Sequence, residues 1–293
     1  MNITLIIPIY NEVQAINSII DRVIKFLNDR SNFDCILVND GSIDGTEKFL
    51  SKLHHNKIQV LHKKNGGYGS AIKFASKYVK SNFFAIIDAD GTYPLEKFDE
   101  MCLNLENYNM VVGSRTSSNS SIPIIKKIPK FFIKLFSSYV TMKEIPDFNS
   151  GMRIFRTSTF RKFLYFLPDG FSLTTTMTII LSSFNYNIKY VEIDYFDRVG
   201  DSKIRPFKDT INFFVTVAKL GIYFKPFRIY GPLIIFFFGV GALFLIYRFL
   251  VGEGFLVLTI LNFMIAMFLL VFCFISSSIS QLIFMQIDKD KDD

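Results

Sequence analysis

Two long uncharged stretches near the carboxyl end limit how this chain can fold more than any other feature of its sequence. Residues 229–247 contain no charged side chain, and a second uncharged stretch covers residues 254–287. A helix rises about 1.5 Å per residue, so each stretch can cross a hydrocarbon layer of about 30 Å. The connection between them, Val-Gly-Glu-Gly at 251–254, is typical of a tight turn. We predict a transmembrane hairpin whose second span covers about 255–276; the alternative is a buried helical hairpin in a soluble protein.

Basic residues flank the predicted hairpin. Lys225 and Arg228 precede it and Lys289 and Lys291 follow it, whereas Arg248 is the positive residue nearest the turn. The positive-inside rule therefore places both ends in the cytoplasm. The chain starts at once with a strand-like run and no cationic segment before it, so we expect no signal peptide and a cytoplasmic amino-terminal domain.

The residues before the hairpin have the composition of a globular domain. Up to about Arg205, charged, polar and apolar side chains alternate, although the whole chain is 50% hydrophobic. We therefore divide the chain into four parts. They are a globular domain at 1–205, juxtamembrane amphipathic helices at 206–228, the hairpin at 229–287 and a tail at 288–293.

The formal net charge of +7 comes from lysines and arginines gathered in clusters. With a hydrophobic hairpin nearby, such clusters favour a membrane surface or a phosphorylated ligand as the partner. Neither an aromatic-plus-basic RNA motif nor zinc-finger spacing accompanies them, so we expect no nucleic acid. Cys35, Cys102 and Cys273 form no C-x-x-C pair, so the sequence supports neither a disulfide framework nor a zinc site.

Strands and helices alternate through the first 112 residues. Short apolar runs predict strands at 3–8, 33–38, 58–61, 83–87 and 110–112, with helical spacing between them. This order predicts right-handed crossovers and a mostly parallel sheet, whose ligands bind beyond the carboxyl ends of the strands. A polar cluster follows each of the first four runs, so we expect these clusters to meet in one site.

The sharpest of these clusters is Asp88-Ala89-Asp90, after the fourth run. Two carboxylates one residue apart can hold a hard divalent cation such as Mg²⁺ or Mn²⁺ against a diphosphate. By itself the pattern also fits turn carboxylates or a helix cap. The other clusters contain glycines and helix starts, which let backbone N–H groups approach phosphates.

Seven segments in order resemble family-2 glycosyltransferases, which are inverting enzymes of the GT-A fold. The segments are PIYNE, NDGSIDGT, NGGYGSA, DADGT, VGSR, DFNSGMR and DRVGDSK, and the similarity runs from Ile3 to about Lys203. Within the family, the chain looks like the dolichol-phosphate mannose synthase and polyprenyl-phosphate glucosyltransferase branch. The resemblance implies an α/β fold: a GT-A, Rossmann-like, mostly parallel sheet followed by a two-helix transmembrane hairpin.

The resemblance also implies the donor site. Pro8, Tyr10 and Glu12 are expected to line the nucleoside pocket, with Asp40 reading the base. The loop glycines Gly66 and Gly69 are expected at the donor as well. A loop similar to the one that closes over the donor contributes three further residues: Arg198, Ser202 and Lys203.

Asp90 is the expected main metal ligand, and Asp88 is expected to contact the ribose or donor sugar and to share the metal. Relatives commonly carry glutamine where this chain has Thr92, so here a water or the threonine hydroxyl must take its place. Arg115 and Arg153 correspond to arginines near the donor diphosphate or the lipid phosphate. Together with the two aspartates, they complete the expected catalytic set.

Lys130 is a further candidate for contact with the lipid phosphate. It lies in a stretch where four lysines alternate with apolar residues, which predicts an amphipathic basic helix at the membrane. A solvated surface helix is the alternative for this stretch.

The implied reaction moves a hexose from a nucleotide-sugar, UDP-glucose or GDP-mannose, onto polyprenyl phosphate. A phosphate monoester is largely dianionic at neutral pH, so it can attack without a general base. Asp169 and Asp147 are the candidates for an acceptor-activating carboxylate, although Asp147 is more readily explained as orienting Arg153 or a loop.

Three other functions remain open from the sequence. A tethered family-2 enzyme could use a glycan or protein acceptor, and a non-catalytic membrane scaffold could keep the fold. A processive polysaccharide synthase is disfavoured. Such enzymes carry a Gln-x-x-Arg-Trp motif and more transmembrane helices, whereas this chain has a single predicted hairpin and lacks tryptophan. The identity of the sugar and association into a homo-oligomer also stay open.

Overall fold

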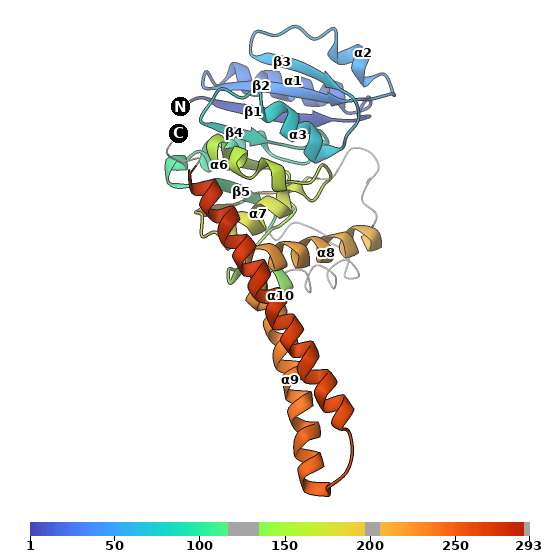
Figure 1. The fold of residues 1–293 in the computed structure, drawn as a ribbon. Helices are drawn as coiled ribbons and strands as arrows, with labels where there is room; N and C mark the ends of the chain where they lie inside the picture. The colour runs from blue at the N-terminus through green and yellow to red at the C-terminus, as the bar shows by residue number, and fades with distance from the viewer. Residues whose placement is uncertain (117–134, 197–205, 290–293) are drawn as a thin grey trace. The chain divides into compact units, whose positions relative to one another are not determined.

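The computed structural model describes residues 1–116, 135–196 and 206–289 (Figure 1). The chain divides into two compact units, which are described separately. The first unit comprises Met1–Phe131 and Glu144–Thr210, and the second comprises Phe132–Lys143 and Ile211–Asp293. The described residues 135–143, which were predicted to lie in the globular domain, therefore belong to the second unit.

The first unit contains a seven-stranded sheet in the order β3-β2-β1-β4-β6-β5-β7. The strands are β1 (Ile3–Ile9), β2 (Phe33–Asp40), β3 (Ile58–Lys63), β4 (Phe83–Ile86), β5 (Met110–Ser114), β6 (Arg153–Arg156) and β7 (Ile188–Glu192). Strand β6 runs antiparallel to both of its neighbours, and the other pairs are parallel. The predicted mostly parallel sheet is confirmed, and each of its five predicted strands starts at the expected residue. Strands β6 and β7 were not predicted.

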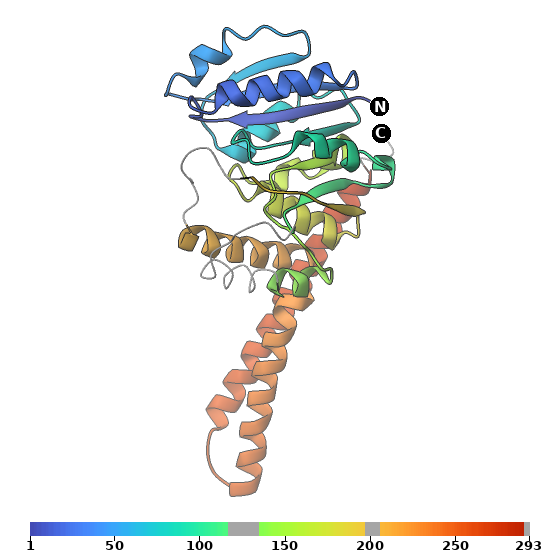
Figure 2. The ribbon, with the colours of Figure 1, turned by 180° about the vertical axis from the view of Figure 1, so that it is seen from behind.

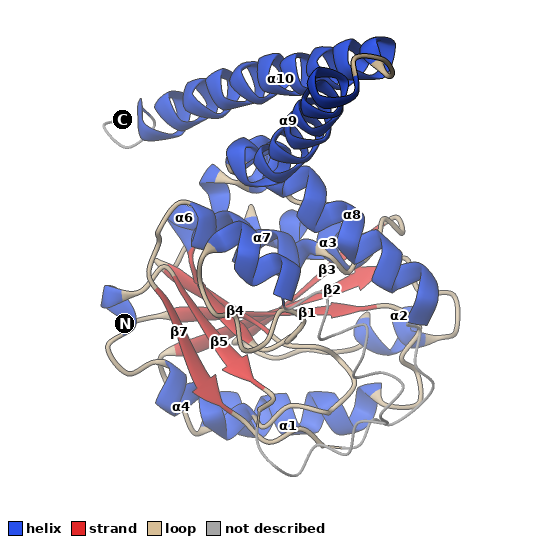
Figure 3. Ribbon diagram, turned by 90° about the horizontal axis from the view of Figure 1, so that it is seen from below, coloured by secondary structure: helices blue, strands red, loops and turns tan. Residues whose placement is uncertain are grey.

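Helices cover both faces of this sheet (Figure 3). Helices α1 (Ile16–Asn28) and α4 (Phe98–Met101) lie on one face, and α3 (Tyr68–Ser76), α6 (Thr157–Lys162) and α7 (Leu173–Ser183) lie on the other. Every residue of β1 is buried, as expected for a central strand between two helical layers. The short elements are α2 (Thr46–Leu50), η1 (Leu95–Lys97), η2 (Leu105–Asn107) and η3 (Leu164–Phe166).

The connectivity indicates the edge of the sheet at which a ligand would bind. From β1 the chain adds β2 and β3 on one side, and then crosses to add β4 on the other side of β1. Such a reversal leaves a crevice beyond the carboxyl ends of the strands, where ligands bind in open α/β sheets. The polar clusters of the sequence follow β1, β2, β3 and β4 at this edge.

The second unit contains a helical hairpin. Helices α9 (Pro226–Val251) and α10 (Leu256–Lys289) run side by side (Figures 1 and 2), and most of α8 (Pro206–Phe224) and the helical residues 135–141 belong to the same unit. Gly252 and Gly254 have φ angles of +80° and +107°, which side chains other than glycine rarely adopt, so they make the turn. Both helices are long and apolar enough to cross a membrane, judged by length and composition.

Candidate active site

The loops after β1 and β2 are joined by hydrogen bonds. The Asn11 backbone N–H donates to Ser42 Oγ (3.0 Å), and Asn11 Oδ1 accepts from the Ile43 N–H (2.8 Å). The Glu12 N–H donates to Thr46 Oγ1 (3.1 Å). Asn11 has a φ of 53°, a left-handed conformation that asparagine tolerates. The two predicted nucleoside-binding segments therefore form one rigid surface.

Asp44 holds this surface together and was not singled out in the sequence. Its carboxylate accepts hydrogen bonds from the Val13 N–H (3.0 Å) and from the Thr46 hydroxyl (2.6 Å). Desolvation tends to raise the pKa of Asp44, but these hydrogen bonds outweigh it and lower the pKa. The sequence feature that could have indicated this contact is Asp-x-Thr, because an aspartate carboxylate often accepts a hydrogen bond from the residue two positions later.

The residues expected around the nucleoside lie on or beneath this surface. Pro8 is buried within β1, and Glu12 is half-buried in the loop that follows. Tyr10 lies at the end of β1 with 36% of its surface exposed, so its side chain is accessible to a ligand. The structure thus brings these three residues to the expected edge of the sheet.

Asp40 fixes the glycine-rich loop. Its Oδ1 accepts from Lys63 Nζ (2.6 Å) and from the Gly66 N–H (3.0 Å), and its Oδ2 accepts from the Gly67 N–H (2.7 Å). The residue is 3% exposed. A carboxylate offers about four acceptor positions, so three bonds within the chain leave one for a base. Lys63 is a contact that the sequence analysis missed.

The glycine-rich loop packs closely against the segment before α7. A Cβ on Gly69 would lie 2.3 Å from the Pro168 carbonyl oxygen, and the Ser70 N–H donates to the Asp169 carbonyl oxygen (3.0 Å). Tyr68 stacks on Phe171 with ring centroids 5.5 Å apart. Burial first, and the negative charge of Asp88 second, raise the pKa of the Tyr68 hydroxyl, so it remains protonated.

The turn after β4 orients Asp90. Asp90 is 6% exposed, and its Oδ1 accepts from the Thr92 hydroxyl (2.6 Å) and the Thr92 N–H (3.2 Å). The Thr92 hydroxyl therefore bonds Asp90 itself. Arg22 of α1 donates to the carbonyl oxygens of Gly91 (2.9 Å) and Tyr93 (3.0 Å), which holds the turn from the opposite helical layer. Arg22 was not predicted, because this contact depends on tertiary packing.

Asp88 lies directly against the backbone of the segment before β6. A Cβ on Gly151 would lie 2.2 Å from Asp88 Oδ2, so a side chain at this position would require the Asp88 carboxylate to move. The Gly151 N–H donates to the Tyr93 hydroxyl (2.7 Å). This close approach joins the Asp88–Asp90 segment to the segment that contains Arg153.

The two aspartates fit a divalent cation that is shared with a diphosphate. Their carboxylate oxygens are the hard ligands that Mg²⁺ and Mn²⁺ prefer. Among residues 1–116, 135–196 and 206–289, the structure forms no group of three or more His, Cys, Asp or Glu side chains that could hold a metal. Asp88 and Asp90 would then supply one or two carboxylates, and phosphate oxygens and water would complete the coordination, as is usual for Mg²⁺.

Arg115 forms a bidentate ion pair with Asp147. Arg115 Nε donates to Oδ2 (2.8 Å) and Nη2 donates to Oδ1 (2.9 Å), and the Arg115 backbone N–H also donates to Oδ2 (3.1 Å). The guanidinium lies 5.2 Å from the centroid of the Tyr195 ring. Burial opposes ionisation of Asp147. The hydrogen bonds and positive charge of Arg115 outweigh this effect and lower the pKa of Asp147 to about 2. Asp147 therefore orients Arg115, whereas the sequence analysis had paired it with Arg153 or a loop.

Arg153 lies inside the protein with no exposed surface. Nε donates to the Ser150 carbonyl oxygen (2.8 Å), Nη1 to Thr178 Oγ1 (2.6 Å) and Nη2 to the Phe148 carbonyl oxygen (2.6 Å). Each guanidinium nitrogen thus has an acceptor inside the protein. This enclosure departs from the direct phosphate contact expected of Arg153 and favours a role in fixing the segment that carries Gly151.

The remaining candidates lie elsewhere. Asp169 is largely exposed and pairs with Lys73 (2.6 Å), and Asp147 is occupied by Arg115, so the structure gives neither carboxylate the environment of a poised base. Four expected ligand-binding residues lie outside the described residues: Lys130, Arg198, Ser202 and Lys203.

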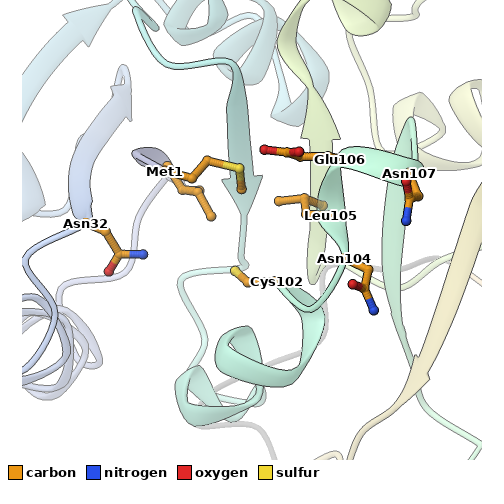
Figure 4. A pocket seen from close by; sticks show the side chains of 8 residues that line it. Met1, Asn32, Cys102, Asn104, Leu105, Glu106 and Asn107 are labelled. Carbon is orange, nitrogen blue, oxygen red and sulfur yellow. The ribbon is translucent and has the colours of Figure 1, made fainter.

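A hollow lies at the edge of the sheet opposite to the candidate active site (Figure 4). It is lined by residues that precede strands, among them Met1, Asn32 and Asn107. Its lining includes none of the predicted site residues.

Comparison with known proteins identifies the family of the chain. The model of the family described as Glycosyl transferase family 2 matches residues 4–165, more than half of the chain. The chain belongs to glycosyl transferase family 2. This glycosyltransferase is 24% identical over 240 residues to a dolichyl-phosphate beta-glucosyltransferase from Dictyostelium discoideum, which covers 74% of the chain and 73% of the relative. It is also 27% identical over 211 residues to a dolichyl-phosphate hexose transferase from Haloferax volcanii. That alignment covers 70% of this chain and 88% of the relative.

Solved structures share the fold. Glucosyl-3-phosphoglycerate synthase from Mycobacterium tuberculosis, solved with Mn²⁺, uridine diphosphate and phosphoglyceric acid, superposes with a TM-score of 0.56 at 16% identity, covering 75% of this glycosyltransferase and 78% of that chain. S. aureus TarS, solved with UDP-GlcNAc, gives a TM-score of 0.52 at 18% identity. The superposition covers 75% of this glycosyltransferase and 66% of the TarS chain. At these identities the likeness establishes the GT-A architecture of the catalytic domain.

Replacing Gly151 with alanine is expected to abolish most of the transferase activity, because the added methyl group would displace the Asp88 carboxylate. Gly170→Ala is the matched control, since a Cβ there meets nothing within 4 Å. Initial rates and circular-dichroism melting, measured together, separate displacement of the site from unfolding. Equal activity in the two variants would contradict the assignment.

The Arg115–Asp147 pair makes stability depend on pH in acid. The folded pKa of Asp147 is about 2 and the unfolded value is about 3.9, so the stabilisation is complete above about pH 5 and is lost as pH falls towards 2. The difference corresponds to between about 2 and 3 kcal/mol. In Asp147→Asn, the melting temperature should fall less steeply between pH 4 and 2.5 than in the wild type. Ellipticity is the suitable signal because the chain has no tryptophan, and identical slopes would contradict the pairing.

Proposed function

We propose that this glycosyltransferase transfers a hexose from a nucleotide-sugar to polyprenyl phosphate at the cytoplasmic face of a membrane. The observation that carries the proposal is the combination of relatives with an apolar hairpin. Relatives that match 70–76% of the chain are named as dolichyl-phosphate glucosyl- or hexosyltransferases. A further one, from Proteus mirabilis, is named as an undecaprenyl-phosphate 4-deoxy-4-formamido-L-arabinose transferase. Helices α9 and α10 supply a membrane anchor for such an enzyme.

The donor is a nucleoside diphosphate sugar, with UDP-glucose as the first candidate and GDP-mannose as the second. Two structural neighbours were solved with uridine nucleotides, and two relatives are named glucosyltransferases, which supports this order. The joined loops after β1 and β2 would hold the nucleoside between Tyr10, Glu12 and Asp40. The glycine-rich loop would approach the phosphates.

Asp90, oriented by Thr92, and Asp88, held against Gly151, would bind Mg²⁺ or Mn²⁺. When bound, the cation offsets the negative charge of the departing nucleoside diphosphate. Asp90 is buried, and burial would strengthen the interaction of its carboxylate with a cation because the local dielectric constant is low.

The acceptor phosphate would attack the anomeric carbon in line with the departing diphosphate. A bond forms between an oxygen of the acceptor phosphate and the anomeric carbon as the bond from that carbon to the diphosphate oxygen breaks, which inverts the configuration. The acceptor is already dianionic, so no proton needs to be removed. Arg115, with a partly exposed guanidinium, would align the acceptor phosphate and offset its charge.

Incubating membranes that contain the enzyme with labelled UDP-glucose or GDP-mannose, Mn²⁺ and a short polyprenyl phosphate tests the proposal. A labelled, organic-extractable product is expected. A water-soluble glycan or glycoprotein product would instead support the tethered-enzyme alternative, and no product from either donor would contradict the proposal for these substrates.

Asp90→Asn should reduce turnover by at least about a hundredfold, because an amide keeps the shape of the carboxylate but not its charge. It should also weaken Mn²⁺ binding in the presence of UDP, measured by calorimetry. Asp99→Asn is the control, since Asp99 pairs with Arg30 on the surface. Equal effects of the two substitutions would exclude Asp90 as the metal ligand.

The hairpin should place its turn on the face opposite to its two ends. In a Cys102→Ser background, Glu253→Cys should react with a membrane-impermeant maleimide from outside right-side-out vesicles, because it lies in the turn. Asp293→Cys should react after the vesicles are opened with detergent. The native Cys35 and Cys273 are buried. Labelling of both positions from the same side would contradict the topology.

A further inference from the structure

The structure assigns to Asp147 a positioning role: it fixes the Arg115 guanidinium so that Nη1 remains as the edge that contacts a phosphate oxygen. This inference rests on the proposed function for the identity of the phosphate, which we take to be that of the acceptor lipid. It does not make Asp147 a base or a metal ligand.

The first support is the way in which the guanidinium is held. Two of its three nitrogens, Nε and Nη2, donate to Asp147, and Nη1 has no partner among the described residues. The Tyr195 ring lies beside the guanidinium, with the ring centroid 5.2 Å from Arg115 Cζ. A bidentate pair on an aromatic ring restricts both rotation and tilt of the planar group. The Arg115 side chain is still 22% exposed, so a ligand can reach it.

The second support is that Asp147 is itself fixed. Its Oδ2 accepts from the Arg115 N–H, and its Oδ1 accepts from the Asn149 N–H (3.0 Å). Asn149 Oδ1 in turn accepts from the Thr175 hydroxyl (2.8 Å) of the buried helix α7. The carboxylate is therefore held by backbone groups from two separate segments, which gives the arginine a defined direction.

The charge of Asp147 has a consequence for binding. A fixed carboxylate beside Arg115 cancels much of its positive charge, so the pair offers a directed N–H donor with little net attraction for anions. Removing the negative charge should therefore tighten phosphate binding while it loosens the alignment. Loss of turnover without loss of affinity distinguishes positioning from simple charge attraction.

The protein contains a matched control at its surface. Arg30 makes the same bidentate contact with Asp99, through Nε (2.8 Å) and Nη2 (2.5 Å), and it also lies over an aromatic ring, that of Phe26 at 4.4 Å. Asp99→Asn thus removes the same kind of pair away from the strand ends that carry the candidate site.

The experiment compares Asp147→Asn with Asp99→Asn in the full-length enzyme. For Asp147→Asn we expect kcat to fall on the order of ten- to a hundredfold, with KM for a short polyprenyl phosphate unchanged or lower. For Asp99→Asn we expect both constants to stay unchanged. An Asp147→Asn enzyme with normal kcat, or with kcat reduced only in proportion to its folded fraction, would overturn the inference.

Arg115→Lys provides a second variant in case Asp147→Asn does not fold. It keeps the positive charge but cannot make the bidentate contact, so kcat should fall to a similar extent. Unchanged kcat in Arg115→Lys would likewise overturn the inference.

Calorimetry with two probes identifies the phosphate independently of turnover. Arg115→Ala should weaken binding of the short polyprenyl phosphate and leave binding of UDP with Mn²⁺ unchanged. The reverse result would place Arg115 at the donor diphosphate and overturn the acceptor assignment. If the wild type binds the prenyl phosphate but forms no lipid-linked product, the proposed function fails. Asp147→Asn should then still bind the prenyl phosphate at least as tightly as the wild type, and weaker binding would overturn the positioning role.

Discussion

The contact between the Asp88 carboxylate and the backbone of Gly151 is the constraint on which the rest of the site depends. It requires β6 to lie antiparallel beside β4, so that the segment before β6 meets the segment after β4 at the same edge of the sheet. A parallel neighbour would instead place its carboxyl end at this edge, and the segment that leads into it would lie at the other edge of the sheet. Tyr93, which accepts a hydrogen bond from Gly151, ties the two segments together on their buried side.

Charges around this contact are compensated in pairs. Asp40 is matched by Lys63, and Asp147 is matched by Arg115. Burial makes an unmatched charge costly, so such pairs hold loops in place without leaving a strong field of either sign. Against this background, a cation beside Asp88 and Asp90 would act on the diphosphate in a site where these two pairs are already formed. Arg115 would then contribute direction more than net charge.

The proposed acceptor would not require a dedicated base. A sugar hydroxyl must lose a proton as it attacks, whereas a phosphate monoester is ionised beforehand. The carboxylates that could have served are committed elsewhere: Asp147 holds Arg115, and Asp169 pairs with Lys73 at the surface. Alignment of two anionic reactants is then the main task of the protein, and a membrane anchor that confines the enzyme to the plane of a lipid acceptor assists it.

The sequence alone determined the hairpin, the first five strands and the order of the segments at their carboxyl ends. These features are local: uncharged length, apolar runs and glycine-containing turns depend on neighbouring residues. Only the tertiary structure decided which charged groups meet. It paired Asp147 with Arg115, enclosed Arg153 and turned the Thr92 hydroxyl onto Asp90. The pairing of Asp147 and the enclosure of Arg153 follow from the insertion of β6 between β4 and β5, which joins residues far apart in the chain and leaves no periodic trace in the sequence.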